Sequence, residues 1–328
     1  MKTILVAGGA GYIGSHMVAL LAEKGYEVVV ADNLCTGHWQ AVKGAKLRVG
    51  DVRDGAFLER VFSEFPIDGV INFAAFSLVG ESVADPLKYY GNNVTGAVSM
   101  LTAMKNHGVD KIVFSSTAAT YGEPEKQPIQ ETDRTEPTNP YGASKLAIEG
   151  LLKWSCQAYG IRYAALRYFN AAGSNPDADI GEDHAPETHL IPIVLQCALG
   201  KRDHVGIFGD DYPTADGTCV RDYIHVRDLA NAHLLALEHL DRGGASGPFN
   251  LGSGDGFSVK EIIETARKVT GAAIPAIVEP RRAGDPSVLI ASNQKAKEVL
   301  GWSPQRGLDE IISDAWIWHK RHPNGYEG

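Results

Sequence analysis

A tyrosine and a lysine one helical turn apart are the first candidates for chemistry. Tyr141 and Lys145 lie in the stretch Asn-Pro-Tyr-Gly-Ala-Ser-Lys, residues 139–145. Pro140 suits the first turn of a helix, because the N–H that it lacks would have no partner there, and a helix places both side chains on one face. A phenol has a pKa near about 10, and a neighbouring ammonium favours the phenolate. The pair predicts a tyrosine acid/base, although an isolated Tyr-x-x-x-Lys is a plain surface pair in about four cases of five.

A glycine-rich turn near the start of the chain predicts a dinucleotide site. Residues 3–7 are a short apolar run typical of a buried parallel strand, and apolar residues recur at helical spacing over 15–23. Between them, Gly8, Gly11 and Gly14 give the spacing Gly-x-x-Gly-x-x-Gly. Glycines let the backbone approach a pyrophosphate, and the helix N-terminus offers free N–H groups. A tight structural turn is the alternative.

Acidic residues at the ends of the next two strands indicate which dinucleotide binds. The strand predicted at 27–32 ends in Asp32, where a carboxylate can accept hydrogen bonds from the adenosine ribose. An acid there repels a 2′-phosphate, so we expect NAD rather than NADP. The strand predicted at 47–52 carries Asp51, which could reach the adenine amino group. Turn capping is the alternative role for Asp32.

A hydroxyl group follows the strand predicted at 111–115. Ligands of open parallel sheets bind beyond the carboxyl ends of the strands. Thr117 is therefore a candidate hydrogen-bond partner for a substrate oxygen. Capping of the turn is an equally good interpretation of the same residue.

Two long helices are predicted, over 85–107 and 140–159. The second has an apolar face wide enough for burial on two sides, one against the sheet and one that could meet a partner subunit. The first has an apolar stripe that we expect to face the core, made by Leu87, Tyr90, Val94, Ala97, Leu101 and Met104.

Composition and charge exclude several classes of protein. The chain has 328 residues, 44% of them hydrophobic, and a formal charge of −9. This charge argues against nucleic acid or an anionic membrane as the main partner. The four cysteines form no Cys-x-x-Cys pair, so we expect no disulfide framework and no metal site. The first residues do not form a signal sequence and no apolar run has membrane length, so we expect a cytoplasmic protein.

The order of these elements predicts an α/β fold with two lobes. We expect residues 1–170 to form a Rossmann-type, doubly wound parallel sheet that binds NAD, with about 218–245 returning to it. Residues 171–328 are expected mainly to form a smaller mixed α/β lobe that binds the substrate.

Longer motifs resemble one protein family over nearly the whole chain. The sequence resembles the extended short-chain dehydrogenase/reductases and, among them, the UDP-glucose 4-epimerases. The first motif below is shared across the superfamily, whereas those at 216–226 and 321–326 are more specific. The motifs are Gly-Gly-Ala-Gly-Tyr-Ile-Gly-Ser-His (8–16), Asp-Asn-Leu (32–34), Val-Gly-Glu-Ser (79–82), Tyr-Tyr-Gly-Asn-Asn-Val (89–94), Arg-Tyr-Phe-Asn (167–170), Asp-Gly-Thr-Cys-Val-Arg-Asp-Tyr-Ile-His-Val (216–226), Pro-Arg-Arg-Ala-Gly-Asp (280–285) and Arg-His-Pro-Asn-Gly-Tyr (321–326).

The resemblance implies an NAD-dependent isomerase that interconverts UDP-galactose and UDP-glucose at C4 through a 4-ketose, as part of galactose metabolism. It also implies a homodimer through the two long helices, which their apolar faces support. It implies that Tyr141 is the acid/base, that Lys145 holds the nicotinamide ribose and lowers the tyrosine pKa, and that Thr117 shares the sugar hydroxyl proton. The implied NAD site comprises Gly8, Gly11, Tyr12, Ile13, Gly14, Asp32, Asn33, Asp51, Val52, Phe73, Ala74, Asn93, Tyr141, Lys145 and Phe169. The implied substrate site comprises Thr117, Asn170, Leu190, Phe208, Arg221, Arg282, Asp285 and Leu289.

Three positions bear on how closely the chain follows this family. Ser77 stands where a lysine often lies near the cofactor, and His189 stands where some epimerases carry asparagine. Leu289 falls where a tyrosine is associated with excluding N-acetylated sugars and a small residue with admitting them. Leucine is intermediate, so we expect turnover of UDP-galactose and UDP-glucose with some activity on UDP-N-acetylglucosamine.

Two other functions remain as alternatives. A sugar-nucleotide 4,6-dehydratase or decarboxylase of the same fold would need acids near Thr117, where this chain has Ala118 and Ala119. A non-catalytic NAD-sensing regulator would usually lose the tyrosine or the lysine, and this chain keeps Tyr141 and Lys145.

Overall fold

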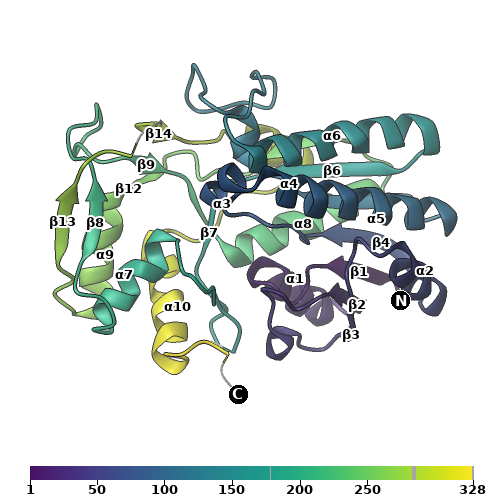
Figure 1. Ribbon diagram of the computed structural model, residues 1–328, viewed down its shortest axis with the longest axis horizontal. Coiled ribbons are helices and arrows are strands. Elements are labelled where there is room, and N and C mark those ends of the chain that lie inside the picture. The colour runs from purple at the N-terminus through teal and green to yellow at the C-terminus, as the bar shows by residue number, and fades with distance from the viewer. Residues whose placement is uncertain (178, 283–285, 327–328) are drawn as a thin grey trace.

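A seven-stranded parallel sheet forms the centre of the larger lobe (Figure 1). The computed structural model describes residues 1–177, 179–282 and 286–326. The strands are β1 (Thr3–Ala7), β2 (Glu27–Asp32), β3 (Lys46–Val49), β4 (Ile67–Asn72), β5 (Lys111–Ser115), β6 (Arg162–Arg167) and β11 (Gly247–Asn250). They lie in the order β11-β6-β5-β4-β1-β2-β3, and every neighbouring pair is parallel. The chain order reverses between β1 and β4, which is where doubly wound sheets bind ligands, so the predicted fold class is confirmed.

Helices cover both faces of this sheet because the strand side chains alternate between two apolar cores. In β1, Ile4 and Val6 point into one core and Leu5 and Ala7 into the other. A strand that is buried on both faces is apolar along its length. The first core also contains residues of α1 (Tyr12–Glu23) and α8 (Val226–Asp241), and the second contains residues of α2 (Gly55–Glu64), α5 (Thr95–Asn106) and α6 (Pro140–Tyr159).

The helix predicted over 85–107 is interrupted. Its elements, with the short helix before it, are α3 (Val79–Ala84), α4 (Pro86–Tyr89), the π-turn η2 (Tyr90–Val94) and α5. A π-turn holds an extra residue, so the apolar stripe does not continue across it. Leu87 is 83% exposed and Tyr90 42% exposed, whereas Ala97, Leu101 and Met104 are buried. The predicted core stripe is therefore wrong for Leu87 and Tyr90.

The smaller lobe combines three helices with short strands. Helices α7 (Leu190–Ala198), α9 (Val259–Thr270) and α10 (Leu308–Arg321) share one apolar core. Its strands are β7 (Asn170–Ala172), β8 (Val205–Phe208), β9 (Val220–Arg221), β10 (Tyr223–His225), β12 (Phe257–Ser258), β13 (Ala276–Glu279) and β14 (Val288–Leu289). β8 pairs with β13, β9 pairs with β12 and β14, and β10 pairs with β7. The remaining short elements are η1 (Trp39–Ala41), η3 (Ala118–Tyr121) and η4 (Ala296–Leu300).

Part of the chain after residue 170 belongs to the larger lobe. Helix α8 packs against α1 on one face of the large sheet. Strand β11 also joins that sheet, beside β6, although it lies beyond the predicted return segment 218–245. The predicted division at residue 170 remains a proposal, with β11 added to the first lobe. No helix in the described ranges is both long and apolar enough to span a membrane.

Candidate active site

A large cavity lies beyond the carboxyl ends of the central strands. Its volume is about 1060 Å³. Gly8, Asn33 and Phe73, which line it, directly follow β1, β2 and β4, and Thr117 lies just beyond β5. The cavity extends to Arg221 of the smaller lobe. The position is the one expected for a ligand of a doubly wound sheet.

The glycine-rich turn forms one wall of the cavity, and close packing requires glycine at two of its positions. Gly8 has φ +75°, and a Cβ there would lie 2.6 Å from the backbone N of Ala74. A Cβ at Gly14 would lie 2.1 Å from the carbonyl oxygen of Gly8. Gly11 precedes α1, and no side chain caps the N–H groups at this helix end. Free N–H groups beside a glycine cradle fit the pyrophosphate of a dinucleotide.

Two acids lie at the far end of this wall. The Asp32 carboxylate accepts hydrogen bonds from the backbone N–H groups of Ala10 at 3.0 Å and Leu34 at 2.8 Å. Burial raises the pKa of Asp32, which is 8% exposed. It thus caps a turn and also lines the cavity. Asp51 forms an ion pair with Arg53, which lowers the pKa of Asp51 to about 2, so this group stays a carboxylate at neutral pH.

Tyr141 lies at the amino end of α6, which begins at Pro140 as predicted. The Asn139 side chain accepts a hydrogen bond from the backbone N–H of Gly142 at 2.9 Å and fixes this helix end. Burial raises the pKa of Tyr141, and a hydrogen bond with the Thr117 side chain opposes the rise. The surrounding protein thus shifts the Tyr141 pKa upward. The family resemblance implies the opposite, namely that Lys145 lowers the Tyr141 pKa.

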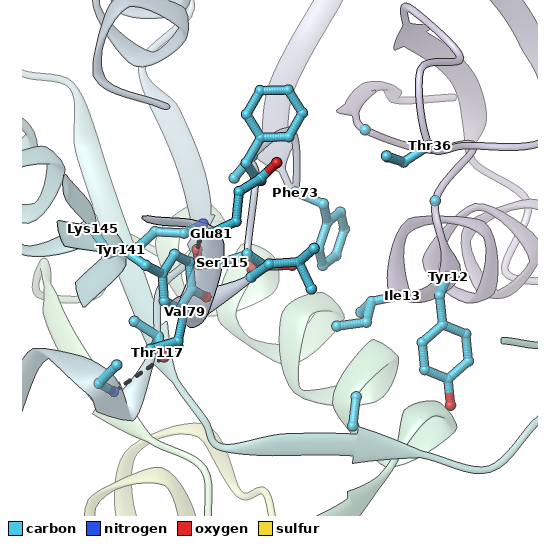
Figure 2. Close-up of a pocket in the computed structure, with 18 of the residues that line it drawn as sticks. Tyr12, Ile13, Thr36, Phe73, Val79, Glu81, Ser115, Thr117, Tyr141 and Lys145 are labelled. Atoms are coloured by element: carbon cyan, nitrogen blue, oxygen red, sulfur yellow. Dashed lines mark hydrogen bonds between the residues drawn. The ribbon is translucent and has the colours of Figure 1, made fainter. Parts of the chain in front are cut away.

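Lys145 lies one turn further along α6 and is only 2% exposed. Its Nζ donates a hydrogen bond to the Ser115 carbonyl oxygen at 2.8 Å and lies 5.9 Å from the centre of the Tyr141 ring (Figure 2). Burial lowers the pKa of Lys145 to about 7, although the nearby Glu149 carboxylate acts in the opposite direction. A lysine side chain with this pKa can gain or lose a proton near neutral pH, and it does so beside the tyrosine.

Thr117 combines the two roles that its sequence position left open. Its hydroxyl accepts a hydrogen bond from the backbone N–H of Ala119 at 3.1 Å and so caps η3. The side chain also lines the cavity beside Tyr141. On the same side, Leu289 and Phe169 pack against an apolar cluster that includes Tyr121. Tyr141, Thr117 and Leu289 therefore border one part of the cavity.

A buried polar network stands behind Lys145. The Glu149 carboxylate accepts hydrogen bonds from Arg167 Nε at 2.9 Å and from the Ser116 hydroxyl at 2.5 Å, and Arg167 Nη2 forms a second bond to it. Arg167 Nη1 also donates to the Tyr121 hydroxyl at 2.8 Å, and this hydroxyl donates to Asn250 Oδ1 at 2.7 Å. The network connects α6 with β6 and β11. The sequence motifs did not reveal it, because its members lie far apart in the chain.

A second cavity of about 590 Å³ adjoins the first. Leu190 and Phe208 line it, and the Arg282 guanidinium carbon lies 3.7 Å from the centre of the Phe208 ring. Thr188, Arg221 and Arg282 line both cavities. One elongated ligand could therefore occupy both, with the two arginines near its middle.

The structure brings most of the predicted site residues together. Leu190 and Phe208 line the second cavity only, and Asp285 lies outside the described residues. The predicted residues that line the first cavity, together with Ser77 and His189, are Gly8, Gly11, Tyr12, Ile13, Gly14, Asp32, Asn33, Asp51, Val52, Phe73, Ala74, Thr117, Tyr141, Lys145, Phe169, Asn170, Arg221, Arg282 and Leu289.

Asn93 is the exception, because it does not belong to the cavity lining. It lies in the π-turn and is 2% exposed. Its side chain accepts a hydrogen bond from Phe76 N at 2.9 Å and donates to Phe76 O and Ser144 Oγ, both at 3.1 Å. Asn93 thus holds the Phe76 loop against α6, and its predicted place in the NAD site stays a prediction.

Known proteins with similar sequences identify the family to which the chain and its cavity belong. A model of the NAD dependent epimerase/dehydratase family matches residues 4–252. The chain belongs to this family. UDP-glucose 4-epimerase from Halalkalibacterium halodurans is 60% identical over 98% of this chain and 97% of its own length. The enzyme of that name from Lacticaseibacillus casei is 59% identical over 99% of this chain and 98% of its own.

Solved structures of similar proteins agree with this assignment. The crystal structure of UDP-glucose 4-epimerase from Brucella ovis in complex with NAD has a TM-score of 0.95 and 48% identity, covering 97% of this chain and 98% of that one. The enzyme from Bifidobacterium longum in complex with NAD⁺ and UDP has a TM-score of 0.92 and 41% identity, covering 99% and 100%. The family membership predicted from the motifs is confirmed.

Members of the cavity lining that the sequence interpretation did not single out come mainly from loops. Thr36 follows β2, Glu81 lies in α3, and Glu182 and His184 lie between β7 and α7. Glu81 accepts hydrogen bonds from the Tyr89 hydroxyl at 2.9 Å and Lys88 Nζ at 2.5 Å. The motif at 79–82 contains Glu81, so the family resemblance held a signal for it. Glu182 and His184 carried no such signal.

Proposed function

We propose that this protein is a UDP-glucose 4-epimerase, which interconverts UDP-galactose and UDP-glucose and keeps NAD as a resident cofactor. One observation carries the proposal: a single cavity joins the glycine-rich turn, the Tyr141–Lys145 pair and the two arginines that open into the second cavity. The names of the relatives, and the NAD and UDP bound in two solved structures, support it.

The residues of the first cavity fit NAD. The turn from Gly8 to Gly14 and the uncapped end of α1 would hold the pyrophosphate, because glycine leaves room for it and the N–H groups can donate to it. Asp32 and Asp51 both line this cavity. Asp32 would accept hydrogen bonds from the adenosine ribose, and Asp51 would face the adenine. When bound, NAD supplies a hydride acceptor and donor. Lys145, buried beside Tyr141, would hold the nicotinamide ribose.

Tyr141 and Thr117 carry the proton chemistry in this proposal. The C4 carbon of the sugar has no leaving group, so inversion requires hydrogen to leave one face and return to the other through a 4-ketose. Tyr141 takes the O4 proton and returns it, and the Thr117 hydroxyl shares that proton through its hydrogen bond with the phenol. When protonated, Lys145 would favour the phenolate and so oppose the effect of burial on the Tyr141 pKa.

The second cavity is suited to the nucleotide of the substrate. Arg221 and Arg282 would bind the diphosphate, because a guanidinium meets phosphate oxygens two at a time. Phe208, with Arg282 on its face, offers an apolar surface for the uracil, and Leu190 lines the same space. Asn170 and Leu289 line the first cavity, where they would border the sugar. Asp285, which lies outside the described residues, remains a prediction from the sequence.

The test is incubation of the purified protein with UDP-galactose and no added NAD, followed by identification of the product. UDP-glucose is expected, because the cofactor should remain bound during purification. A 4-keto-6-deoxy sugar would instead support the dehydratase, although Ala118 and Ala119 supply no acid beside Thr117. Absence of turnover with NAD supplied in excess would support a non-catalytic regulator and overturn the proposal.

A homodimer through the outer faces of α5 and α6 is part of this proposal. Ile148 and Leu152 of α6 are buried toward the sheet, whereas Trp154 is 66% exposed and Tyr159 56% exposed. Val98 of α5 is 46% exposed. Large exposed apolar side chains on adjacent helices suit a subunit interface. A dimeric mass in solution that becomes monomeric in Trp154→Glu is expected, and a monomeric wild-type protein would contradict it. The cytoplasmic location also remains a proposal, which cell fractionation would test.

A further inference from the structure

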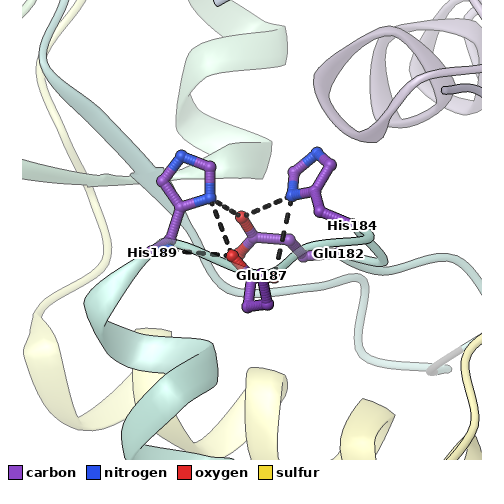
Figure 3. Close-up of side chains that lie close together, drawn as sticks. All are labelled: Glu182, His184, Glu187 and His189. Carbon is purple, nitrogen blue, oxygen red and sulfur yellow. Dashed lines mark hydrogen bonds and ion pairs between the residues drawn. The ribbon is translucent and has the colours of Figure 1, made fainter. Parts of the chain in front are cut away.

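Four potential metal ligands meet in the segment between β7 and α7. Glu182, His184, Glu187 and His189 each offer one nitrogen or oxygen atom, and these atoms all lie within 4.8 Å of one another. Figure 3 shows both imidazole rings turned toward the two carboxylates. The proposed epimerisation uses none of these side chains.

Four nitrogen–oxygen separations in this cluster lie close to the spacing of ligands around a tetrahedral metal ion. His189 Nδ1 lies 2.9 Å from Glu182 Oε1 and 3.1 Å from Glu187 Oε1. His184 Nδ1 lies 3.3 Å from Glu182 Oε1 and 3.7 Å from Glu187 Oε2. Nitrogen and oxygen ligands bind Zn²⁺ at about 2.0–2.2 Å, which places tetrahedral ligands about 3.3–3.6 Å apart. These four separations therefore differ from the tetrahedral spacing by about 0.4 Å or less.

Burial and charge also suit a divalent cation. The Glu182 and Glu187 side chains are each only 5% exposed, so two negative charges lie close together away from water. Buried like charges need a positive partner. Two carboxylates and two neutral imidazoles would balance the charge of a divalent cation, and this mixture of nitrogen and oxygen ligands is typical of zinc.

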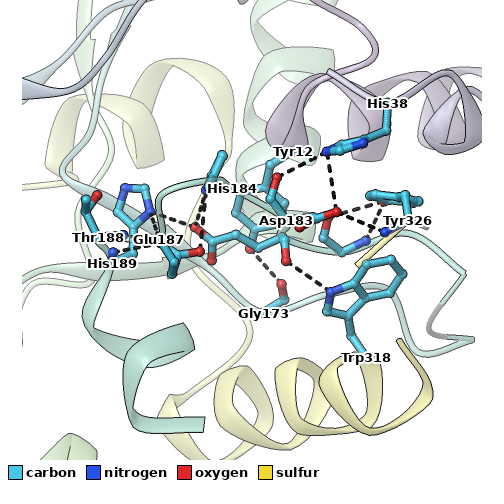
Figure 4. A network of polar contacts seen from close by, with 12 residues as sticks. Tyr12, His38, Gly173, Asp183, His184, Glu187, Thr188, His189, Trp318 and Tyr326 are labelled. Atoms are coloured by element: carbon cyan, nitrogen blue, oxygen red, sulfur yellow. Dashed lines mark hydrogen bonds and ion pairs between the residues drawn. The ribbon is translucent and has the colours of Figure 1, made fainter. Parts of the chain in front are cut away.

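Neighbouring groups hold the segment in place. Glu187 Oε1 accepts hydrogen bonds from the backbone N–H groups of Thr188 at 2.7 Å and His189 at 2.8 Å. The Trp318 indole N–H donates to the Glu182 carbonyl oxygen at 3.1 Å (Figure 4). Outer contacts that orient ligands in this way are a regular part of metal sites.

We propose that Glu182, His184, Glu187 and His189 bind a divalent transition-metal cation of the zinc type, which fixes the segment 182–189. The cation would have a structural role. Glu182, His184 and His189 line the first cavity, and the adjacent Thr188 lines both cavities. The metal would thus stabilise the wall where the two cavities meet. The sequence interpretation expected no metal, because it considered only the spacing of cysteines.

The competing explanation is a cluster of ion pairs without a metal. Burial lowers the pKa of both imidazoles, but the carboxylates outweigh it and raise the pKa of His184 to about 9 and of His189 to about 10. Two imidazolium groups could then satisfy the carboxylates. A cation must displace these protons, so metal binding itself has to be measured.

The experiment uses the full-length protein, treated with a chelator and then titrated with Zn²⁺ against a chromophoric competitor. One equivalent is expected to bind tightly, and Co²⁺ is expected to give the intense visible absorption of a tetrahedral site. His184→Ala and His189→Ala should each raise the Kd by more than about tenfold, a loss of at least about 1.4 kcal/mol. His204→Ala is the matched control, because His204 is a half-exposed histidine of the same lobe, 3.9 Å from Glu279.

Glu187→Gln keeps the proposal testable if the histidine variants do not fold. A glutamine oxygen can still accept from Thr188 and His189, but the variant lacks the negative charge and should bind Zn²⁺ more weakly. Absence of stoichiometric binding to the wild type would overturn the proposal and support the ion-pair cluster. Binding that is unchanged in all three ligand variants would overturn it as well, because the metal would then lie elsewhere. None of these readouts depends on epimerase activity.

Discussion

The two cavities have walls of different kinds. On the dinucleotide side, the glycine-rich turn brings backbone up to the cavity, and a Cβ added at Gly8 or Gly14 would collide with backbone atoms. On the sugar-nucleotide side, Phe208, Arg221 and Arg282 contribute long side chains from well-separated segments. Backbone in a packed sheet cannot move without disrupting the core, whereas long side chains can change rotamer. This difference suits a cofactor that stays bound and a substrate that exchanges.

The largest effect is expected where the two sides meet, at Tyr141. Tyr141→Phe removes the hydroxyl that exchanges a proton with O4, and loss of a general acid/base lowers kcat by about 10²–10⁴-fold. The rate should be measured with UDP-galactose, together with the NAD content, which should stay unchanged. Tyr159→Phe, on the exposed end of the same helix, is the control. A wild-type rate in Tyr141→Phe would remove the assigned role.

Two adjacent arginines test whether long side chains bind the substrate on the sugar-nucleotide side. Arg282→Ala should raise KM for UDP-galactose by about 10- to 100-fold, because hydrogen bonds to charged groups contribute about 1.5–3 kcal/mol. Arg281→Ala is the control, since Arg281 pairs with Asp211 at 2.6 Å and stacks on Tyr212 at 4.0 Å. Its KM should stay within about twofold, as for other exposed ion pairs. Equal effects of the two changes would place the diphosphate elsewhere.

Two helical glycines test whether the dinucleotide side requires close approach of backbone atoms. Gly14→Ala would put a Cβ 2.1 Å from the Gly8 carbonyl oxygen, so overpacking should destabilise the protein by about 1–3 kcal/mol and lower its NAD content. Gly55→Ala, at the first position of α2, places its Cβ in open space away from the proposed subunit interface and should stabilise by up to about 0.5 kcal/mol, since alanine favours a helix. Denaturant unfolding measures both. The same sign for the two substitutions would contradict the steric argument.

The lowered pKa of Lys145, which lies on the dinucleotide side, predicts that the stability of the protein depends on pH. Burial lowers its pKa from 10.5 to about 7, so between these values the unfolded chain binds more protons than the folded protein. Stability therefore gains from Lys145 as pH rises through this window, by up to about 1.4 kcal/mol per pH unit. Lys145→Met should flatten the rise measured by denaturant unfolding of NAD-stripped protein at pH 7.5–9.5, and the exposed Lys153→Met should not. Parallel curves for wild type and Lys145→Met would refute the shift.

The smallest effect is expected for a substitution of Leu289, which lines the first cavity. It tests how closely the substrate side fits the sugar. Leu289→Ser makes room beside the sugar and should raise kcat/KM for UDP-N-acetylglucosamine relative to UDP-glucose by about tenfold, in the range of one or two methylene groups in a pocket. Both sugars should be assayed with the same enzyme preparation. Undetectable turnover of the N-acetylated sugar by the wild type would show that leucine closes the pocket, contrary to our prediction. No change in the ratio would place Leu289 away from the sugar.

Local signals predicted most of the larger lobe. β1, β2 and β5 are apolar runs bounded by turns, and Pro140 marked the start of α6, so the fold class followed from adjacent residues. The sequence did not predict that β11 joins the large sheet, because Gly247 and Pro248 are not typical of a strand, although an edge position tolerates proline. The π-turn misplaced Leu87 and Tyr90, since one extra residue changes the helical phase.

The candidate site was predictable where it is built from motifs and unpredictable where it depends on distant contacts. Tyr141, Lys145 and the glycine turn have spacings with a physical meaning. The contacts of Asn93 with Phe76, and the cluster around Glu182, arise only when loops meet in the folded chain. The pKa shift of Tyr141 was likewise hidden, because burial depends on the whole fold.

The pairing of Glu149 with Arg167 has a consequence for the lysine nearby. Glu149 lies four residues after Lys145 on α6, the spacing at which opposite charges on a helix attract each other. Arg167 hydrogen-bonds both carboxylate oxygens, so the charge of Glu149 is partly compensated and attracts the Lys145 ammonium less strongly. Because Arg167 binds Glu149, Lys145 makes its hydrogen bond to the Ser115 carbonyl oxygen instead. The lysine therefore stays beside the space where the reaction is proposed to occur.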